Sequence, residues 1–374
     1  MRVLLFLVVC LTLSSCVSDK VNCLAGVVRN GQCGPFKAGA IKFDPTLDAV
    51  KPMAPMSYGG YALSEDLLIS SFRDRWVGGY SLKAKGFTWW QGFDSPVASP
   101  IGVYGSWVVV GLRDGTLVKL ESLTGKKVWD VEIGRFTDRD MVLEGKVLIL
   151  HASNNEVFGI DFQTGEKLWI YEGDAPDPLS LRGAVKPLVF ENKVFVGTSK
   201  GDIHVLDLRT GVLLRRFALG GSQFRFTDVI GSMVVQSGKL LFSRYDGLVG
   251  ALEISDGSGR FAWKRELPSI ATSTYREGIF YLGGVNGDVI ALDALNGERK
   301  WRTSSGETIY SISVGEKALY LAGADGQITV LESATGQLQW ADNIVGSIHP
   351  RPIVFGKFMY FATGLKTLYG YKVR

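Results

Sequence analysis

A repeat of 40 residues or slightly more is the feature that most constrains how this 374-residue chain can fold. Each copy has a turn containing Asp-Gly or Asn-Gly, an alternating apolar strand that ends in Leu or Ile, a Thr-Gly-type turn, and then Trp. The clearest copies run from Gly111 to Trp129 and from Gly283 to Trp301. Further copies end at Trp169, Phe217, Trp263 and Trp340, and a degenerate first copy carries Trp89 and Trp90. Seven units are visible, and self-similarity at this period predicts a repeat architecture.

Each unit contains about four short strands, which predicts an all-β fold. Asn-Gly and Asp-Gly accept the positive φ that a tight hairpin turn requires. A four-stranded antiparallel sheet with two apolar faces must bury both against neighbours, and radial stacking of such sheets does this. A Trp at the same register of each unit then fills the wedge between adjacent sheets. We therefore predict one β-propeller with four-stranded antiparallel blades.

The end of the chain bears on the number of blades. After Trp340, three more strands are expected over residues 351–355, 357–362 and 367–371, without a final Trp turn. A strand near Leu47–Pro52 is expected to complete this blade, so that the two ends of the chain join and leave no open sheet edge. We expect eight blades over residues 46–374, with seven blades as the alternative.

The N-terminus has the features of an export signal. Met1 and Arg2 precede an apolar stretch, Val3 to Leu13, which is too short to span a bilayer stably. The following Leu13-Ser14-Ser15-Cys16 resembles the lipobox of bacterial lipoproteins, which implies cleavage before Cys16 and lipidation of that residue. We expect a signal peptide over residues 1–15 and a lipidated linker over 16–45. Ordinary cleavage beside an incidental cysteine is the alternative.

Two other cysteines, Cys23 and Cys33, flank a Gly-containing stretch in a compartment that permits disulfides. A small closed loop between them is expected, with two free thiols as the alternative. The formal net charge of +4 comes from basic and acidic residues spread along the chain, with no basic run. Nucleic acid is therefore not expected as a partner, because phosphate binding requires concentrated positive charge.

Catalytic and metal-binding motifs are not found in the sequence. The histidines, His151, His204 and His349, are isolated from one another, whereas metal sites need convergent ligands. A nucleophile elbow, a P-loop and a dinucleotide fingerprint are also not found. We expect no metal, no cofactor and no enzyme activity.

The unit from Ala291 through Gly297 to Trp301 resembles the repeat of the pyrroloquinoline-quinone-type propellers. Two groups share this repeat: the quinoprotein dehydrogenases, which are much larger and add a calcium and quinone site, and the BamB family of outer-membrane assembly lipoproteins. Val17 after the cysteine, by analogy with enteric lipoprotein sorting, implies the outer membrane. The repeat is specific for the fold and not for the function.

Two segments resemble the BamB family more closely. Leu179-Ser-Leu181-Arg182-Gly looks like the loop through which that family contacts BamA, the barrel-bearing subunit. Asp228-Val229 resembles the start of an Asp-Val-Asp loop in the next unit, but Ile230 replaces the second aspartate. The resemblance assigns partner binding to Leu179, Leu181, Arg182 and Asp228, with Asp228 either holding Arg182 or supplying a charge at the interface rim. The alternative is that Arg182 and Asp228 pair on the surface while the leucines pack internally.

The repeat spacing points independently to the same two loops. Trp129 to Trp169 is 40 residues, whereas Trp169 to Phe217 is 48 and Phe217 to Trp263 is 46. Insertions in repeat proteins map to loops on one face, which is often the binding face.

The expected function is a non-catalytic scaffold on the periplasmic face of the outer membrane, lipid-anchored, that binds the periplasmic POTRA domains of BamA. Unfolded β-barrel clients are considered as further partners. Two alternatives stay open: an envelope propeller with another protein or carbohydrate partner, and a small quinone-dependent dehydrogenase.

Overall fold

The computed structural model describes residues 28–29, 32–33, 36–42 and 60–372, apart from 73–74, 85, 136, 138, 153, 176–184, 324, 347, 349–351, 356–357 and 363–366. The described segments are strands and their connections, and none of them is an apolar helix that could cross a bilayer.

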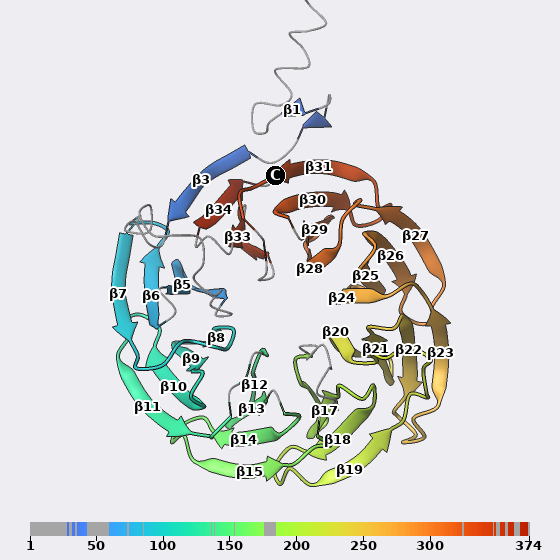
Figure 1. The fold of residues 1–374 in the computed structure, drawn as a ribbon, viewed down its shortest axis with the longest axis horizontal. Helices are drawn as coiled ribbons and strands as arrows, with labels where there is room; N and C mark the ends of the chain where they lie inside the picture. The colour runs from blue at the N-terminus through green and yellow to red at the C-terminus, as the bar shows by residue number, and fades with distance from the viewer. Residues whose placement is uncertain are drawn as a thin grey trace, which may run out of the picture.

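Four-stranded antiparallel sheets, here called blades, surround a central axis (Figure 1). Blades I to VII each consist of four consecutive strands, with the first nearest the axis and the fourth at the rim. Blades I to IV contain β4 Tyr61–Ser64, β5 Leu67–Phe72, β6 Trp76–Ser81, β7 Gly86–Gly92; β8 Gly102–Tyr104, β9 Trp107–Gly111, β10 Thr116–Glu121, β11 Lys127–Glu132; β12 Val142–Glu144, β13 Val147–His151, β14 Val157–Asp161, β15 Lys167–Tyr171; and β16 Leu188–Phe190, β17 Lys193–Gly197, β18 Ile203–Asp207, β19 Leu213–Phe217. Blades V to VII contain β20 Val229–Gln236, β21 Lys239–Arg244, β22 Leu248–Glu253, β23 Phe261–Glu266; β24 Ile270–Arg276, β25 Ile279–Gly284, β26 Asp288–Asp293, β27 Arg299–Ser304; and β28 Ile309–Val314, β29 Ala318–Gly323, β30 Gln327–Glu332, β31 Leu338–Asn343.

We predicted eight blades, with seven as the alternative. The sheet that closes the ring corrects this prediction. Seven blades are continuous units of the chain, and the eighth four-stranded sheet, blade VIII, is a composite in the order β3-β34-β33-β32. Its strands are β3 Phe36–Lys42, β32 Ile353–Phe355, β33 Phe358–Ala362 and β34 Thr367–Lys372. The predicted closing strand, residues 47–52, lies outside the described residues, and β3 pairs with β34 in its place. The sheets of the ring therefore begin at Phe36, inside the segment that the sequence assigned to the linker.

A short hairpin precedes the ring. It consists of β1 Val28–Arg29 and β2 Gln32–Cys33, with Cys33 opposite Val28. Cys16 and Cys23 lie outside the described residues, so lipidation and the Cys23–Cys33 bridge remain predictions.

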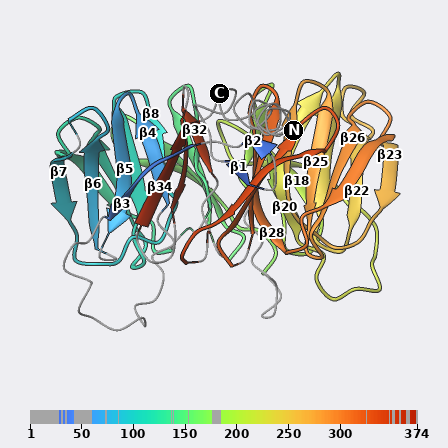
Figure 2. The same cartoon turned by 90° about the horizontal axis from the view of Figure 1, so that it is seen from above.

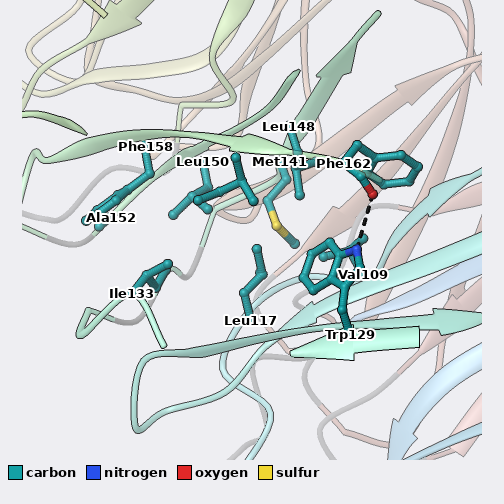
Figure 3. Close-up of a cluster of buried hydrophobic side chains, with 11 residues drawn as sticks. Val109, Leu117, Trp129, Ile133, Met141, Leu148, Leu150, Ala152, Phe158 and Phe162 are labelled. Atoms are coloured by element: carbon teal, nitrogen blue, oxygen red, sulfur yellow. Dashed lines mark hydrogen bonds between the residues drawn. The ribbon is translucent and has the colours of Figure 1, made fainter. Parts of the chain in front are cut away.

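The repeated Trp packs between blades, as predicted. The Trp129 indole N–H donates to the Phe162 carbonyl of the next blade at 3.2 Å (Figure 3), and Trp169 does the same to Leu208 at 3.0 Å. Equivalent bonds join Trp89 to Ser122, Trp263 to Ala294 and Trp301 to Ser333. Figure 3 also shows how Trp129 meets apolar side chains of blades II and III, including Leu117 and Leu148. Each of these five Trp residues is thus both an apolar wedge and a donor that fixes the distance to the next blade, whereas the buried Nε1 of Trp340 has no such partner among the described residues.

The glycine of the Thr-Gly turn completes the wedge. Gly211 lies against the Trp169 ring of the preceding blade, and a Cβ at that position would come within 2.4 Å of the ring. Gly211 also has φ +69°, a conformation that side chains with a Cβ disfavour. The Thr-Gly and Trp parts of the repeat are therefore one packing unit that spans two blades.

Candidate protein-interaction site

The two enlarged loops lie on the same face of the ring. Each connects the rim strand of one blade to the axial strand of the next: β15 to β16, and β19 to β20. Because consecutive strands are antiparallel, all such connections leave the same face of the ring. The hairpin turns between the third and fourth strands of each blade lie on the opposite face, and Figure 2 shows the ring edge-on with both faces. The first loop contains Leu179, Leu181 and Arg182, which lie outside the described residues, so their predicted contacts stay predictions. The second loop, residues 218–228, is described throughout.

The ends of the two loops meet inside the ring. Val185, at the end of the first loop, and Val229, directly after the second, belong to one core cluster and are fully buried. Both lie next to Gly197 at the end of β17, where a Cβ would come within 2.6 Å of Val229 and 3.5 Å of Val185. The described ends of the two loops are therefore neighbours.

A buried ion pair holds the second loop. Arg244, at the end of β21, has a side chain 2% exposed and binds Asp246 through both carboxylate oxygens, with Nε to Oδ1 at 3.0 Å. Its Nη1 donates to the carbonyl oxygen of Gly220 at 2.9 Å, within the loop. Burial alone would raise the pKa of Asp246, but hydrogen bonds from Arg244 and Ser222 outweigh it and lower the pKa. The carboxylate therefore stays charged and ties the loop to blade V.

Asp228 lies at the point where this loop enters β20. Its residue is 1% exposed, and its backbone carbonyl accepts the Tyr245 N–H at 2.9 Å. A buried carboxylate does not serve as a rim charge, so of the two predicted roles only the positioning role fits this burial. Whether Arg182 is the group that it positions is still a prediction.

Ile230 takes the position at which the resemblance expects a second aspartate. It is 5% exposed and belongs to a core cluster with Leu241 and Ile270. The strand bulges directly after it, because Gly231 has φ +72° and lies so close to Ser273 that no Cβ fits. The position has thus become part of the apolar core between blades V and VI.

Buried polar side chains hold the base of the first loop. Asn155 has φ +65° in a turn where blades II and IV to VII have Gly, and its amide donates to the Asp174 carbonyl at 3.0 Å and to Ser199 at 2.9 Å. The Asp174 carboxylate pairs with Arg216 at 3.2 Å. These contacts join blades III and IV. The unusual Asn in place of the turn Gly is the one signal for these contacts in the sequence.

The two described histidines lie in the same region. Burial and the charge of Arg139 hold the pKa of His151 well below its usual range, and burial likewise lowers the pKa of His204. His204 Nδ1 hydrogen-bonds the Tyr171 hydroxyl at 3.0 Å. Both rings are therefore neutral packing groups near pH 7, and His349 lies outside the described residues. Within the described part of the chain, no three His, Cys, Asp or Glu side chains gather to form a metal site.

The match to known proteins extends over most of the chain. A family model described as outer membrane protein assembly factor BamB matches residues 73–303 and 257–371. The BamB of Moranella endobia is 25% identical over 250 residues, which are 66% of this chain and 63% of that protein. The BamB of Yersinia pestis is 30% identical over 206 residues, 54% of this chain and 51% of that protein. The aligned part of this chain thus spans between half and two thirds of the length of these relatives.

Solved structures show the same fold. The crystal structure of BamB from Moraxella catarrhalis superposes with a TM-score of 0.77 at 22% identity, covering 91% of this chain and all of that one. A europium-containing methanol dehydrogenase superposes with a TM-score of 0.73 at 12% identity, covering 90% and 93% of the two chains. Likeness at this identity extends to the fold and not to the chemistry. The family model, however, covers well over half of the sequence, and this chain belongs to the family of the outer membrane protein assembly factor BamB.

Proposed function

We propose that this chain is a non-catalytic scaffold of the outer-membrane β-barrel assembly machinery that binds the periplasmic domains of BamA through the two enlarged loops. The observation that carries the proposal is the family match over residues 73–371, because the relatives with that match are named as assembly factors. The enzyme alternative has only the fold-level likeness to the dehydrogenases in its support.

The geometry of the loop face supports a binding role. The described ends of the two loops meet in the core of blades IV and V, and insertions on one face of a repeat protein are a common place for binding residues. Leu179 and Leu181 would supply apolar anchors, and Arg182 a multidentate donor beside them. The N-terminal lipid on Cys16 would keep this scaffold at the periplasmic face of the outer membrane.

Co-purification with BamA tests this function. We expect Leu181→Glu and Arg182→Glu to lose BamA from the solubilised membrane, because each places a negative charge in the contact. Arg209→Glu is the matched control, since Arg209 is exposed on a hairpin turn of the opposite face. Retention of BamA by both loop variants at the level of this control would refute the assigned interface.

Lipidation has a separate test. The wild-type protein should incorporate labelled palmitate and sediment with the outer membrane, whereas Cys16→Ser should do neither. Incorporation of the label into Cys16→Ser would show that the lipid is attached elsewhere.

A further inference from the structure

We infer that the 218–228 loop is a preformed recognition element that presents Phe224 as its apolar anchor to a pocket with an acidic border on the partner. This inference rests on the proposed function and names a part of the site that neither the repeat nor the family resemblance assigns.

Phe224 is exposed at the tip of the loop. Its residue is 57% exposed, although burial of an aromatic side chain is favourable. Gln223 and Arg225 on either side are exposed as well. An exposed aromatic beside an arginine is the composition that is enriched at the energetic centre of protein interfaces.

A chain of polar contacts fixes this tip to the core of blade V. The Phe224 backbone N–H donates to the Ser222 hydroxyl oxygen at 3.0 Å. The Ser222 side chain interacts in turn with the Asp246 carboxylate, which is held by Arg244. Arg244 also binds the Gly220 carbonyl, so the ion pair restrains the loop at two points before the tip.

The segment after the tip is packed just as closely. The Phe226 ring meets Tyr245 edge-on, with centroids 6.3 Å apart. The Thr227 carbonyl lies so near Gly201 that a Cβ there would come within 2.7 Å. The Val229 N–H donates to the Thr198 carbonyl at 3.1 Å. Phe224 therefore projects from a loop that is held on both sides, and a rigid anchor loses little conformational entropy when it binds.

Asp246 provides a buried carboxylate that Ile230 cannot. Ile230 belongs to the apolar core, whereas Asp246 lies on the turn between β21 and β22 and contacts Ser222 of the loop. Its side chain is 5% exposed and its charge is balanced by Arg244, so it acts on the loop and not on a partner. Arg244 and Asp246 are accordingly positioning residues, and the contact surface is apolar and positive through Phe224 and Arg225.

Binding of the full-length chain to purified periplasmic domains of BamA tests the inference. Phe224→Ala should raise the Kd about 10- to 100-fold, the effect of removing an interface hot spot. Leu295→Ala is the matched control, because Leu295 is similarly exposed, at 51%, on a turn of the opposite face, and its Kd should stay unchanged. Both variants should unfold at the wild-type urea concentration, since each removes an exposed side chain. Arg225→Glu should also weaken binding, and more strongly at low salt.

A double-mutant cycle tests the positioning role. Arg244→Met should raise the Kd in the wild-type background and speed amide exchange in residues 220–226. In the Phe224→Ala background it should raise the Kd little further, because there is no longer an anchor to position. An unchanged Kd for Phe224→Ala, with wild-type protein bound, would overturn the inference and leave the proposed function standing. Failure of the wild-type chain to bind these domains would instead overturn the proposed function, and this choice of partner with it.

Discussion

Replacement of Gly211 by alanine tests the packing unit that explains the repeat. The new Cβ would lie 2.4 Å from Cε3 and 2.6 Å from Cδ2 of Trp169, and that ring is fixed by its bond to the Leu208 carbonyl. Adopting φ +69° costs a residue with a Cβ about 1–2 kcal/mol. Overpacking a fixed core ring costs about 1–3 kcal/mol more. We expect Gly211→Ala to lower the free energy of unfolding by about 2–5 kcal/mol, the sum of these effects.

Gly145→Ala separates the two contributions. Gly145 has φ +58° in the hairpin between β12 and β13, but a Cβ there would meet nothing within 4 Å. Only the conformational cost of about 1–2 kcal/mol applies to it. Both variants should be measured by urea unfolding, followed by tryptophan fluorescence and by circular dichroism so that the two probes can be compared. If Gly211→Ala lowers the free energy of unfolding no more than Gly145→Ala does, the structure accommodates the new Cβ beside Trp169 without strain. The packing of glycine against Trp would then not explain why Thr-Gly and Trp recur together.

Four further outcomes are expected. Trp169→Phe should lower the free energy of unfolding by about 1–2 kcal/mol, because the buried Leu208 carbonyl loses its donor, and an unchanged urea midpoint would contradict this. The pKa of buried His151 is lowered in the folded state, so the unfolded state takes up a proton first as the pH falls. The free energy of unfolding should therefore decrease below about pH 6.5, by up to about 1.4 kcal/mol per pH unit. His151→Leu should flatten that slope in unfolding curves measured across this pH range. The lowered pKa of Asp246 stabilises the folded state fully above the usual value of 3.8, and this stabilisation is lost as the pH falls through the folded-state pKa. Asp246→Asn should therefore lose less of its free energy of unfolding as the pH falls below about 3.8. A chain that starts at residue 46 lacks β3 and exposes the edge of β34, so light scattering should show self-association that a chain starting at residue 34 avoids.

The regular part of the fold could be predicted because the same local rule is repeated along the chain. Asp-Gly and Asn-Gly turns, alternating strands and the Thr-Gly to Trp spacing each specify a piece of one blade, and seven copies of them agree. Blade VIII could not be assigned in the same way. Its rim strand, β3, comes from a part of the chain without the repeat, and its pairing with β34 joins residues more than 300 positions apart. Such pairing depends on where the ring happens to close and leaves little local signal.

The sequence predicts a candidate site at the two enlarged loops, but it does not predict the contacts that hold the second loop. Loop lengths between Trp169, Phe217 and Trp263 indicated two loops of consecutive blades, and the structure shows that both connections leave the same face; their role in binding stays a prediction. The contacts that hold the second loop were missed, because Arg244 and Asp246 occupy a strand end and a turn that read as an ordinary copy of the repeat. Only the three-dimensional arrangement shows that they reach across to Gly220 and Ser222. Phe224 was missed for a related reason, since exposure of an aromatic cannot be inferred inside a loop without periodicity.

Buried charged, histidine and asparagine side chains are concentrated on the side of the ring that carries these loops. Among the described residues, six of the eight charged, histidine or asparagine residues that are buried belong to blades III to V or to the connections that lead into them; the eight are Lys119, Arg139, His151, Asn155, His204, Asp228, Arg244 and Asp288. Burying such groups costs free energy unless each finds partners. Asn155 and Arg244 provide direction, because their hydrogen bonds to the Asp174 and Gly220 carbonyls each fix a loop at one position, whereas apolar contact lets a loop slide. Loops held in one conformation in this way are what the proposed binding surface requires, whereas a mere connection between blades does not need them.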